Sequence, residues 1–191
     1  MSQDISEPFS PKLAATMLYA LGKAGDMGVM RLAKVVYLSD YTYAKTFGNL
    51  HGYLEGHYRY TYGPIPKQFY PTLRHLYRTE KAVRNDKNIV LKNRSSFLAH
   101  IDELELTEQE KACVDKVLEK IKLTSLSEVK AMAYKTEPMV EIQKKESTLY
   151  MGMKMLNAPM DFSTIKRHPL FAYEDLDISF MNDPEFQKNL S

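Results

Sequence analysis

The side chains that could support chemistry are few in this sequence, and their spacing does not favour a reaction centre. The five histidines show neither HxxxH nor HxH spacing, and none stands beside the one cysteine; they are His51, His57, His75, His100 and His168. Zinc sites need closely spaced nitrogen and sulfur ligands, so no metal site is predicted. Cys113 falls on the apolar side of a predicted helix, where a buried thiol is unreactive.

Catalytic and nucleotide-binding motifs are also missing. The sequence contains no GxSxG, no P-loop and no GxGxxG, and so lacks the turns that carry acyl-transfer and nucleotide chemistry. Two close carboxylate pairs, Asp102/Glu103 and Asp175/Asp177, lie in polar stretches. Such surroundings would not give the two carboxyl groups of a pair the different pKa values that an acid and a base need. We therefore expect no catalytic residue and no cofactor, and a protein that is not an enzyme.

Binding chemistry is better represented, in the stretch HYRYTYGPIP. Tyr58, Tyr60 and Tyr62 stand at alternate positions and lead into a turn that contains Pro64 and Pro66. A strand near 57–62 would place the three rings on one face. Such a row is compatible with an aromatic layer over helices, with the hydroxyls at the surface. It is equally compatible with a protein interface, where tyrosine is enriched.

Charge and composition suit a small protein of the cytoplasm. The 191 residues carry a net charge of +2, but residues 51–100 hold nine Lys or Arg against three Asp or Glu. This asymmetry fits an acidic partner or the ordinary solvated faces of helices. No apolar stretch approaches the roughly 20 residues that span a bilayer. The start MSQDISEPFS lacks the basic segment of a secretory signal, and a single cysteine cannot form an internal disulfide. Together these features favour a reducing, cytoplasmic setting.

The elements that must position these residues are mostly helical. Ser10-Pro11 predicts the start of a helix that Gly25 ends. A second helix follows Asp26 and ends at Phe47-Gly48. Beyond the tyrosine row, Pro66 is placed to start a helical region, with a turn over 66–70 and a regular helix over about 71–80.

The later half contributes a hairpin and two capped helices. Polar residues at 85–88 separate two short β-favouring runs and predict a hairpin near 82–92. Thr107 and Ser125 each precede a glutamate by three residues, the spacing of a capping box that starts a helix. The second of these helices stops before Thr136-Glu137-Pro138. The fold class expected is mainly α (α+β), a compact helical domain with a small β element.

The order of the predicted elements is also compatible with nucleic-acid binding. Lys67, Arg74 and Arg78 lie on or near the polar side of the predicted helix after the tyrosine row. The hairpin that follows carries further basic residues, which are Arg84, Lys87, Lys92 and Arg94. Helices followed by a basic helix and a basic hairpin resemble the order of a winged helix. A winged-helix-like DNA-binding transcriptional regulator is therefore the alternative function.

The middle of the chain contains two distinctive motifs, the helix KVVYLSD, from Lys34 to Asp40, and the segment YGPIP, from Tyr62 to Pro66. Together they resemble the Panacea domain family, which includes SocA-like antitoxins and phage-associated proteins. The segment TSLSEVKAMAYKTEPM is similar to a later helix of the family. The likeness spans roughly residues 10–145. It departs where Ala133-Tyr134 and Pro138-Met139 replace the Thr-His and Pro-Trp pairs of many members.

The resemblance implies a module that acts by binding. Its expected partner is a cognate toxin protein, and a Clp-type protease is a further partner if the protein acts as a proteolytic adaptor. The partner-binding residues expected are Tyr58, Tyr60, Tyr62, Pro64, Pro66, Lys67, Arg74 and Arg78. The expected division is a leader at 1–9, the Panacea-like domain at 10–145 and an extension at 146–191. That extension either packs on the domain or forms a partner-binding tail.

Overall fold

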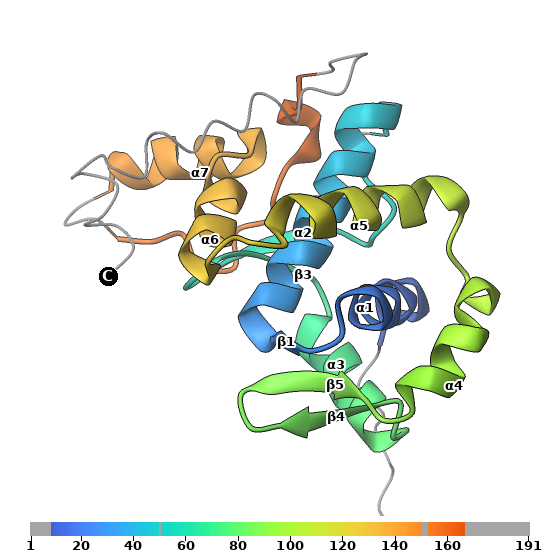
Figure 1. The fold of residues 1–191 in the computed structure, drawn as a ribbon. Coiled ribbons are helices and arrows are strands. Elements are labelled where there is room, and N and C mark those ends of the chain that lie inside the picture. The colour runs from blue at the N-terminus through green and yellow to red at the C-terminus, as the bar shows by residue number, and fades with distance from the viewer. Residues whose placement is uncertain (1–8, 50, 150–152, 167–191) are drawn as a thin grey trace, which may run out of the picture.

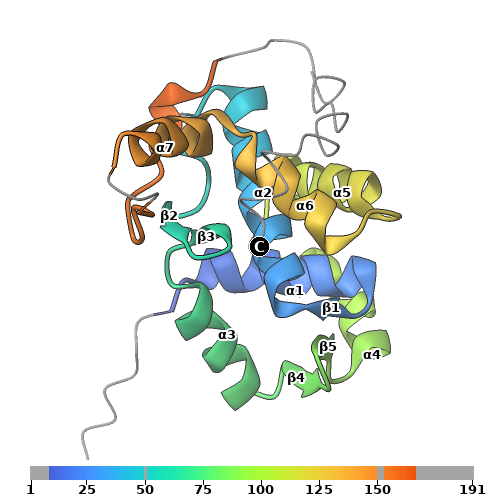
Figure 2. The same cartoon turned by 90° about the vertical axis from the view of Figure 1, so that its left-hand side faces the viewer.

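A computed structural model describes residues 9–49, 51–149 and 153–166. It confirms the predicted class: helices form most of the molecule, and the strands form two small antiparallel sheets. The hairpin β4–β5 and helix α3 lie at one end, and α7 lies at the other (Figures 1 and 2). None of the helices in the described part is long and apolar enough to cross a membrane.

Helices α1 and α2 form the centre of the core. Helix α1 (Pro11–Ala24) is capped by Ser10, whose side chain accepts from the backbone N–H of Leu13, and it ends at Gly25 as predicted. Helix α2 (Val29–Phe47) ends at Gly48, which adopts the left-handed conformation at φ +70°. Both helices are buried along most of their length, and α2 runs through the middle of the molecule (Figure 1).

The predicted capping boxes are both confirmed. Helix α5 (Glu108–Ile121) starts at the box formed by Thr107 and Glu110, and α6 (Leu126–Tyr134) starts at the box of Ser125 and Glu128. Helix α6 stops before Thr136-Glu137-Pro138 as predicted, and a helix that was not predicted, α7 (Glu137–Ser147), follows it. That proline occupies the first turn of α7, where a missing N–H costs no intrahelical bond.

Two hairpins supply the strands. The first pairs β2 (His57–Tyr60) with β3 (Gly63–Pro66), and the second pairs β4 (Ala82–Asn85) with β5 (Asn88–Leu91), as predicted near 82–92. A two-residue strand, β1 (Met27–Gly28), was not predicted and pairs with β5, so the larger sheet has the order β1-β5-β4.

The prediction that Pro66 starts a helical region is wrong, because this residue ends β3 opposite His57. The chain then turns at Gln68, whose φ of +57° is left-handed, and α3 (Phe69–Arg78) begins at Phe69. Pro71 is the third residue of α3 and lies within the first turn, so the helix continues through it without losing a hydrogen bond. Two short elements, α4 (Arg94–Ala99) and the 3₁₀ turn η1 (Ile101–Glu103), connect β5 to α5.

The segment after α7 packs on the domain where it is described. Asn157 and Met160 donate backbone hydrogen bonds to Arg59 and His57, at 2.7 and 2.9 Å, along the edge of β2. Phe162, in the 3₁₀ turn η3 (Phe162–Thr164), is buried. The predicted boundary at 145 falls inside α7. Residues 1–8 of the predicted leader and residues 167–191, with Asp175 and Asp177, lie outside the described residues.

Candidate partner-binding site

The tyrosine row lies on the β2–β3 hairpin, but its buried face is not the aromatic one. His57 and Arg59 are each 1% exposed, whereas Tyr58 and Tyr60 are half-buried on the other side of β2. Strand β2 ends at Tyr60, so Tyr62 lies in the turn and is 52% exposed. The alternation was predicted correctly. The side chains of His57 and Arg59 point inward because Asp40 and Glu146 are hydrogen-bond partners for them there.

Helix α2 carries three polar residues about one turn apart beneath the hairpin, and one of them, Asp40, is the partner of His57. Lys34, Tyr37 and Asp40 are all fully buried. The Nζ of Lys34 donates to the carbonyl oxygen of Pro64 at 2.6 Å, which joins the helix motif directly to the YGPIP motif. A buried polar group is tolerated when it is hydrogen-bonded, so each of these residues also fixes a neighbouring segment.

Asp40 holds the loop that leads into β2. Its Oδ1 accepts from the backbone N–H groups of Tyr53 and Leu54, at 2.5 and 3.2 Å, and its Oδ2 lies 2.6 Å from Nε2 of His57. Gly52 allows this close approach, because a Cβ there would stand 2.3 Å from Oδ1 of Asp40 and its φ is +68°.

Tyr37 and Arg59 tie the hairpin region to the later helices. The hydroxyl of Tyr37 lies 2.5 Å from Oγ1 of Thr136, at the junction of α6 and α7. The Nε of Arg59 donates to Glu146 of α7 at 2.9 Å, and its Nη1 donates to the hydroxyl of Tyr134 at 3.2 Å. Tyr134 of α6 thereby supports Arg59.

Burial and nearby cations lower the pKa of Lys34. Desolvation has the largest effect, and the charges of Lys130 and Arg59 add to it, so the pKa falls from 10.5 to about 7. The amine therefore loses much of its charge near neutral pH while it still donates to Pro64. Hydrogen bonds and the ion pair between Arg59 and Glu146 thus support the hairpin from below.

The outer side of the hairpin pairs each tyrosine with a neighbour. Lys67 lies over the ring of Tyr58 at 5.2 Å, and Lys130 of α6 lies over the ring of Tyr62 at 4.9 Å. Tyr60 and Tyr70 bring their ring centroids to 5.9 Å. We call this surface the hairpin face; it consists of Tyr58, Tyr60, Tyr62, Lys67 and Lys130.

The other residues predicted to bind a partner lie in different surroundings. Pro64 and Pro66 are buried in β3 and can only support the surface. Arg74 and Arg78 are exposed on α3, which continues from the hairpin. Lys130 was missed by sequence reasoning, because nothing in its local sequence links it to a tyrosine 68 positions earlier.

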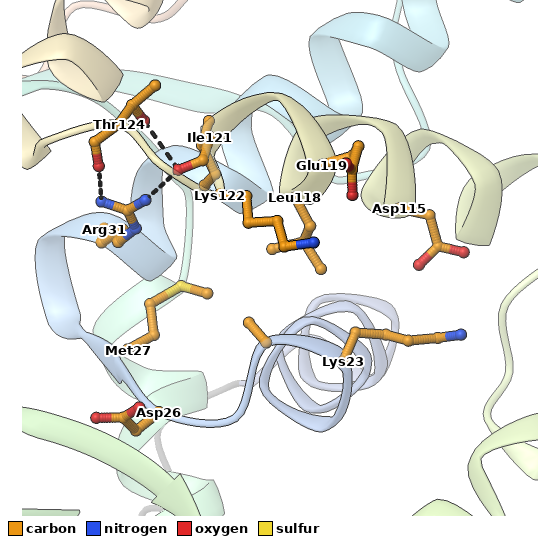
Figure 3. A pocket seen from close by; sticks show the side chains of 11 residues that line it. Lys23, Asp26, Met27, Arg31, Asp115, Leu118, Glu119, Ile121, Lys122 and Thr124 are labelled. Carbon is orange, nitrogen blue, oxygen red and sulfur yellow. Dashed lines mark hydrogen bonds between the residues drawn. The ribbon is translucent and has the colours of Figure 1, made fainter.

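A separate cavity of about 670 Å³ opens between the end of α1, the start of α2 and the end of α5 (Figure 3). Arg31 lies at one side and donates to the carbonyl oxygens of Ile121, the last residue of α5, and Thr124, which follows the helix. The charged side chains around the cavity are of both signs: Lys23, Arg31, Lys122, Asp26, Asp115 and Glu119. This mixture selects neither an anion nor a cation, so the cavity is a weaker candidate than the hairpin face.

Potential reactive groups are not assembled. No group of three or more His, Cys, Asp or Glu that could hold a metal ion occurs in the part of the chain that the structure describes. Cys113 is buried as predicted, and desolvation raises the pKa of its thiol to about 12. His57 pairs with Asp40, but Phe162 stacks on its ring with centroids 5.1 Å apart, so the pair is closed to solvent.

Fold and site together define a mainly helical domain whose buried polar groups brace a surface hairpin. A sequence model of the family described as antitoxin SocA-like, Panacea domain, matches residues 32–138. The chain belongs to this family of SocA-like antitoxins. The match includes Lys34, Tyr37, Asp40 and the YGPIP segment. No curated protein and no solved structure matches the chain.

Proposed function

We propose that this protein neutralises a cognate protein toxin by binding it through the hairpin face. Membership of an antitoxin family points to a toxin partner and to a non-catalytic role. The observation that carries the proposed surface is Tyr62, whose ring is 52% exposed although the hairpin beneath it is held by buried hydrogen bonds. A large ring kept exposed on a fixed support is a common feature of binding sites.

The braced hairpin would favour binding by limiting the entropy lost on docking. Lys34, Asp40 and Arg59 already hold the strand and turn in one position, so little ordering remains for the complex to supply. The rings offer apolar area, while Lys67 and Lys130 place positive charge beside them. This combination suits an acidic, partly apolar surface on the toxin.

Co-expression with a toxin, sought by testing the adjacent genes for one that is lethal without this protein, tests the proposal. Tyr62→Ala and Lys130→Ala should each weaken rescue of growth, and the affinity of the purified pair should fall about 30-fold for Tyr62→Ala, the loss typical of an interface hot spot. Arg74→Ala and Arg78→Ala test whether the interface extends onto α3.

A matched control is Phe47→Ala. Phe47 is another exposed aromatic residue, 44% exposed, at the end of α2 outside the hairpin face. It should leave rescue and affinity unchanged. Full rescue and wild-type affinity for folded Tyr62→Ala and Lys130→Ala would mean that the toxin binds elsewhere.

Holding the toxin and delivering it to a Clp-type protease are different activities that the family resemblance allows. They differ in the fate of the toxin. If the protein is a proteolytic adaptor, the half-life of the toxin in cells should shorten when the protein is present and recover when the protease is removed. If binding alone neutralises the toxin, its half-life should not depend on the protease.

A further inference from the structure

The elements at the end of the molecule opposite α7 have the arrangement of a winged helix. Leaving aside the β2–β3 hairpin, the order is α1, β1, α2, α3, β4 and β5. The short strand between the first two helices pairs with the last strand, so the sheet order is β1-β5-β4. This pairing places the β4–β5 hairpin beside α3, as both overall views show (Figures 1 and 2). In a winged helix, the third helix and this hairpin are the parts that contact nucleic acid.

Helix α3 presents a polar, basic side to solvent. Phe69, Leu73 and Leu76 face the core and are at most 5% exposed. Arg74 and Arg78 are exposed on the other side, and Tyr70 and Tyr77 are half-buried. A helix anchored by one apolar stripe and basic on its outer side has the form of a recognition helix.

Basic residues continue from α3 onto the hairpin. Residues 74–94 contain seven Lys or Arg and only two acids, Glu80 and Asp86. Lys92 pairs with Glu80, and Arg94 donates to the carbonyl oxygen of Gly22. The other five are also exposed, and we call them the basic end: Arg74, Arg78, Lys81, Arg84 and Lys87. Among them, the Nε of Arg84 donates to the carbonyl oxygen of Asp86 at 2.8 Å.

The positive field of the basic end acts on a neighbouring histidine. The pKa of His75 is lowered, first by desolvation and then by the charges of Arg78 and Lys81. Arg78, Lys81 and Lys87 form no ion pair with any residue in the described part of the chain. Their charges are therefore available to an external polyanion.

We propose that the basic end binds double-stranded DNA, with α3 in the major groove and the β4–β5 turn against the phosphate backbone. The major groove of B-form DNA, about 12 Å wide, accepts an α-helix. Arg84 and Lys87 flank the turn at Asp86, where they can reach phosphates beside the groove. This activity uses residues outside the hairpin face, so it does not depend on toxin binding.

Fluorescence anisotropy with the full chain and a labelled duplex of about 25 base pairs tests the proposal. If about four phosphates are neutralised, the affinity should fall about 100-fold between about 50 and 200 mM salt. The variant R84E/K87E should bind at least about tenfold more weakly than the wild type, since it replaces two phosphate contacts with repulsion.

The control variant is K144E/K145E, which changes the net charge by the same amount. Lys144 and Lys145 are exposed on α7, at the opposite end of the molecule. This control should bind DNA nearly as well as the wild type. A milder variant, R84A/K87A, gives the same comparison if circular dichroism shows that R84E/K87E is misfolded.

Three results would overturn the proposal. The first is an equal loss of affinity in R84E/K87E and K144E/K145E, which would mean that only net charge attracts the DNA. The second is no binding at about 50 mM salt. The third is duplex RNA of the same length bound at least as tightly as DNA, because the narrow major groove of A-form RNA excludes a helix.

Discussion

Replacing Lys34 with methionine tests whether the amine below the hairpin is neutral in the folded protein. Lys34 is fully buried, and its pKa is lowered from 10.5 to about 7 by desolvation and by two nearby cations. In the unfolded chain the lysine keeps its ordinary pKa. Between these two values the unfolded state therefore binds more protons than the folded state, and stability rises with pH.

The magnitude follows from the two pKa values. One pKa unit corresponds to about 1.4 kcal/mol, so the full effect between pH 7 and 10.5 is about 4.8 kcal/mol. Over an accessible range, from about pH 6 to about pH 9, the wild type should gain about 2.5 kcal/mol relative to Lys34→Met. Below about pH 6 the lysine is protonated in both states, and the difference between the two proteins should become flat.

Urea denaturation of both proteins at a series of pH values measures this difference. Other titrating groups cancel because they are common to wild type and variant. Loss of the hydrogen bond to Pro64 adds a constant that does not vary with pH. Lys144→Met, a change of the same kind on the exposed side of α7, should give a pH-independent difference. A flat difference for Lys34→Met between about pH 6 and 9 would show that Lys34 stays charged when buried.

Three further substitutions or reactions test the packing around the site. Gly52→Ala should lower the melting temperature more than Gly56→Ala does. Both glycines have positive φ, but only at Gly52 would a Cβ stand against Asp40, at 2.3 Å. Similar losses in the two variants would contradict this contact. Phe162→Ala should cost about 3 kcal/mol in urea denaturation, as expected for a buried aromatic ring, and an unchanged midpoint would show that η3 does not stabilise the domain. Cys113 should react with a thiol reagent only as fast as the protein unfolds, since its pKa is raised to about 12; rapid labelling of the native protein would refute its burial.

Local signals in the sequence were sufficient for most helix ends. Ser10, Thr107 and Ser125 act on backbone groups within three residues, and the structure shows each cap where it was predicted. The exception involves proline. Pro66 suits either a boundary or a first turn, and the choice depends on strand pairing rather than on the neighbouring residues.

The candidate site was predicted in part. The tyrosines and the two motifs were identified, but the hairpin face also includes Lys130 from α6, which only the fold brings beside Tyr62. The buried prolines support that face and do not form its surface. Tyr70 of α3 lies next to this face, with its ring centroid 5.9 Å from that of Tyr60, and only the fold brings these two residues together.

The sequence alone determined the capped helices and the β4–β5 hairpin, because capping, turn formation and apolar periodicity depend on residues a few positions apart. It could not determine which side of β2 is buried, since tyrosines would ordinarily be placed inward and arginine outward. Tertiary structure reversed that order by placing Asp40 beside His57 and Glu146 beside Arg59. Once such partners offset the cost of desolvation, the polar side can be buried, and the aromatic side is left for the surface.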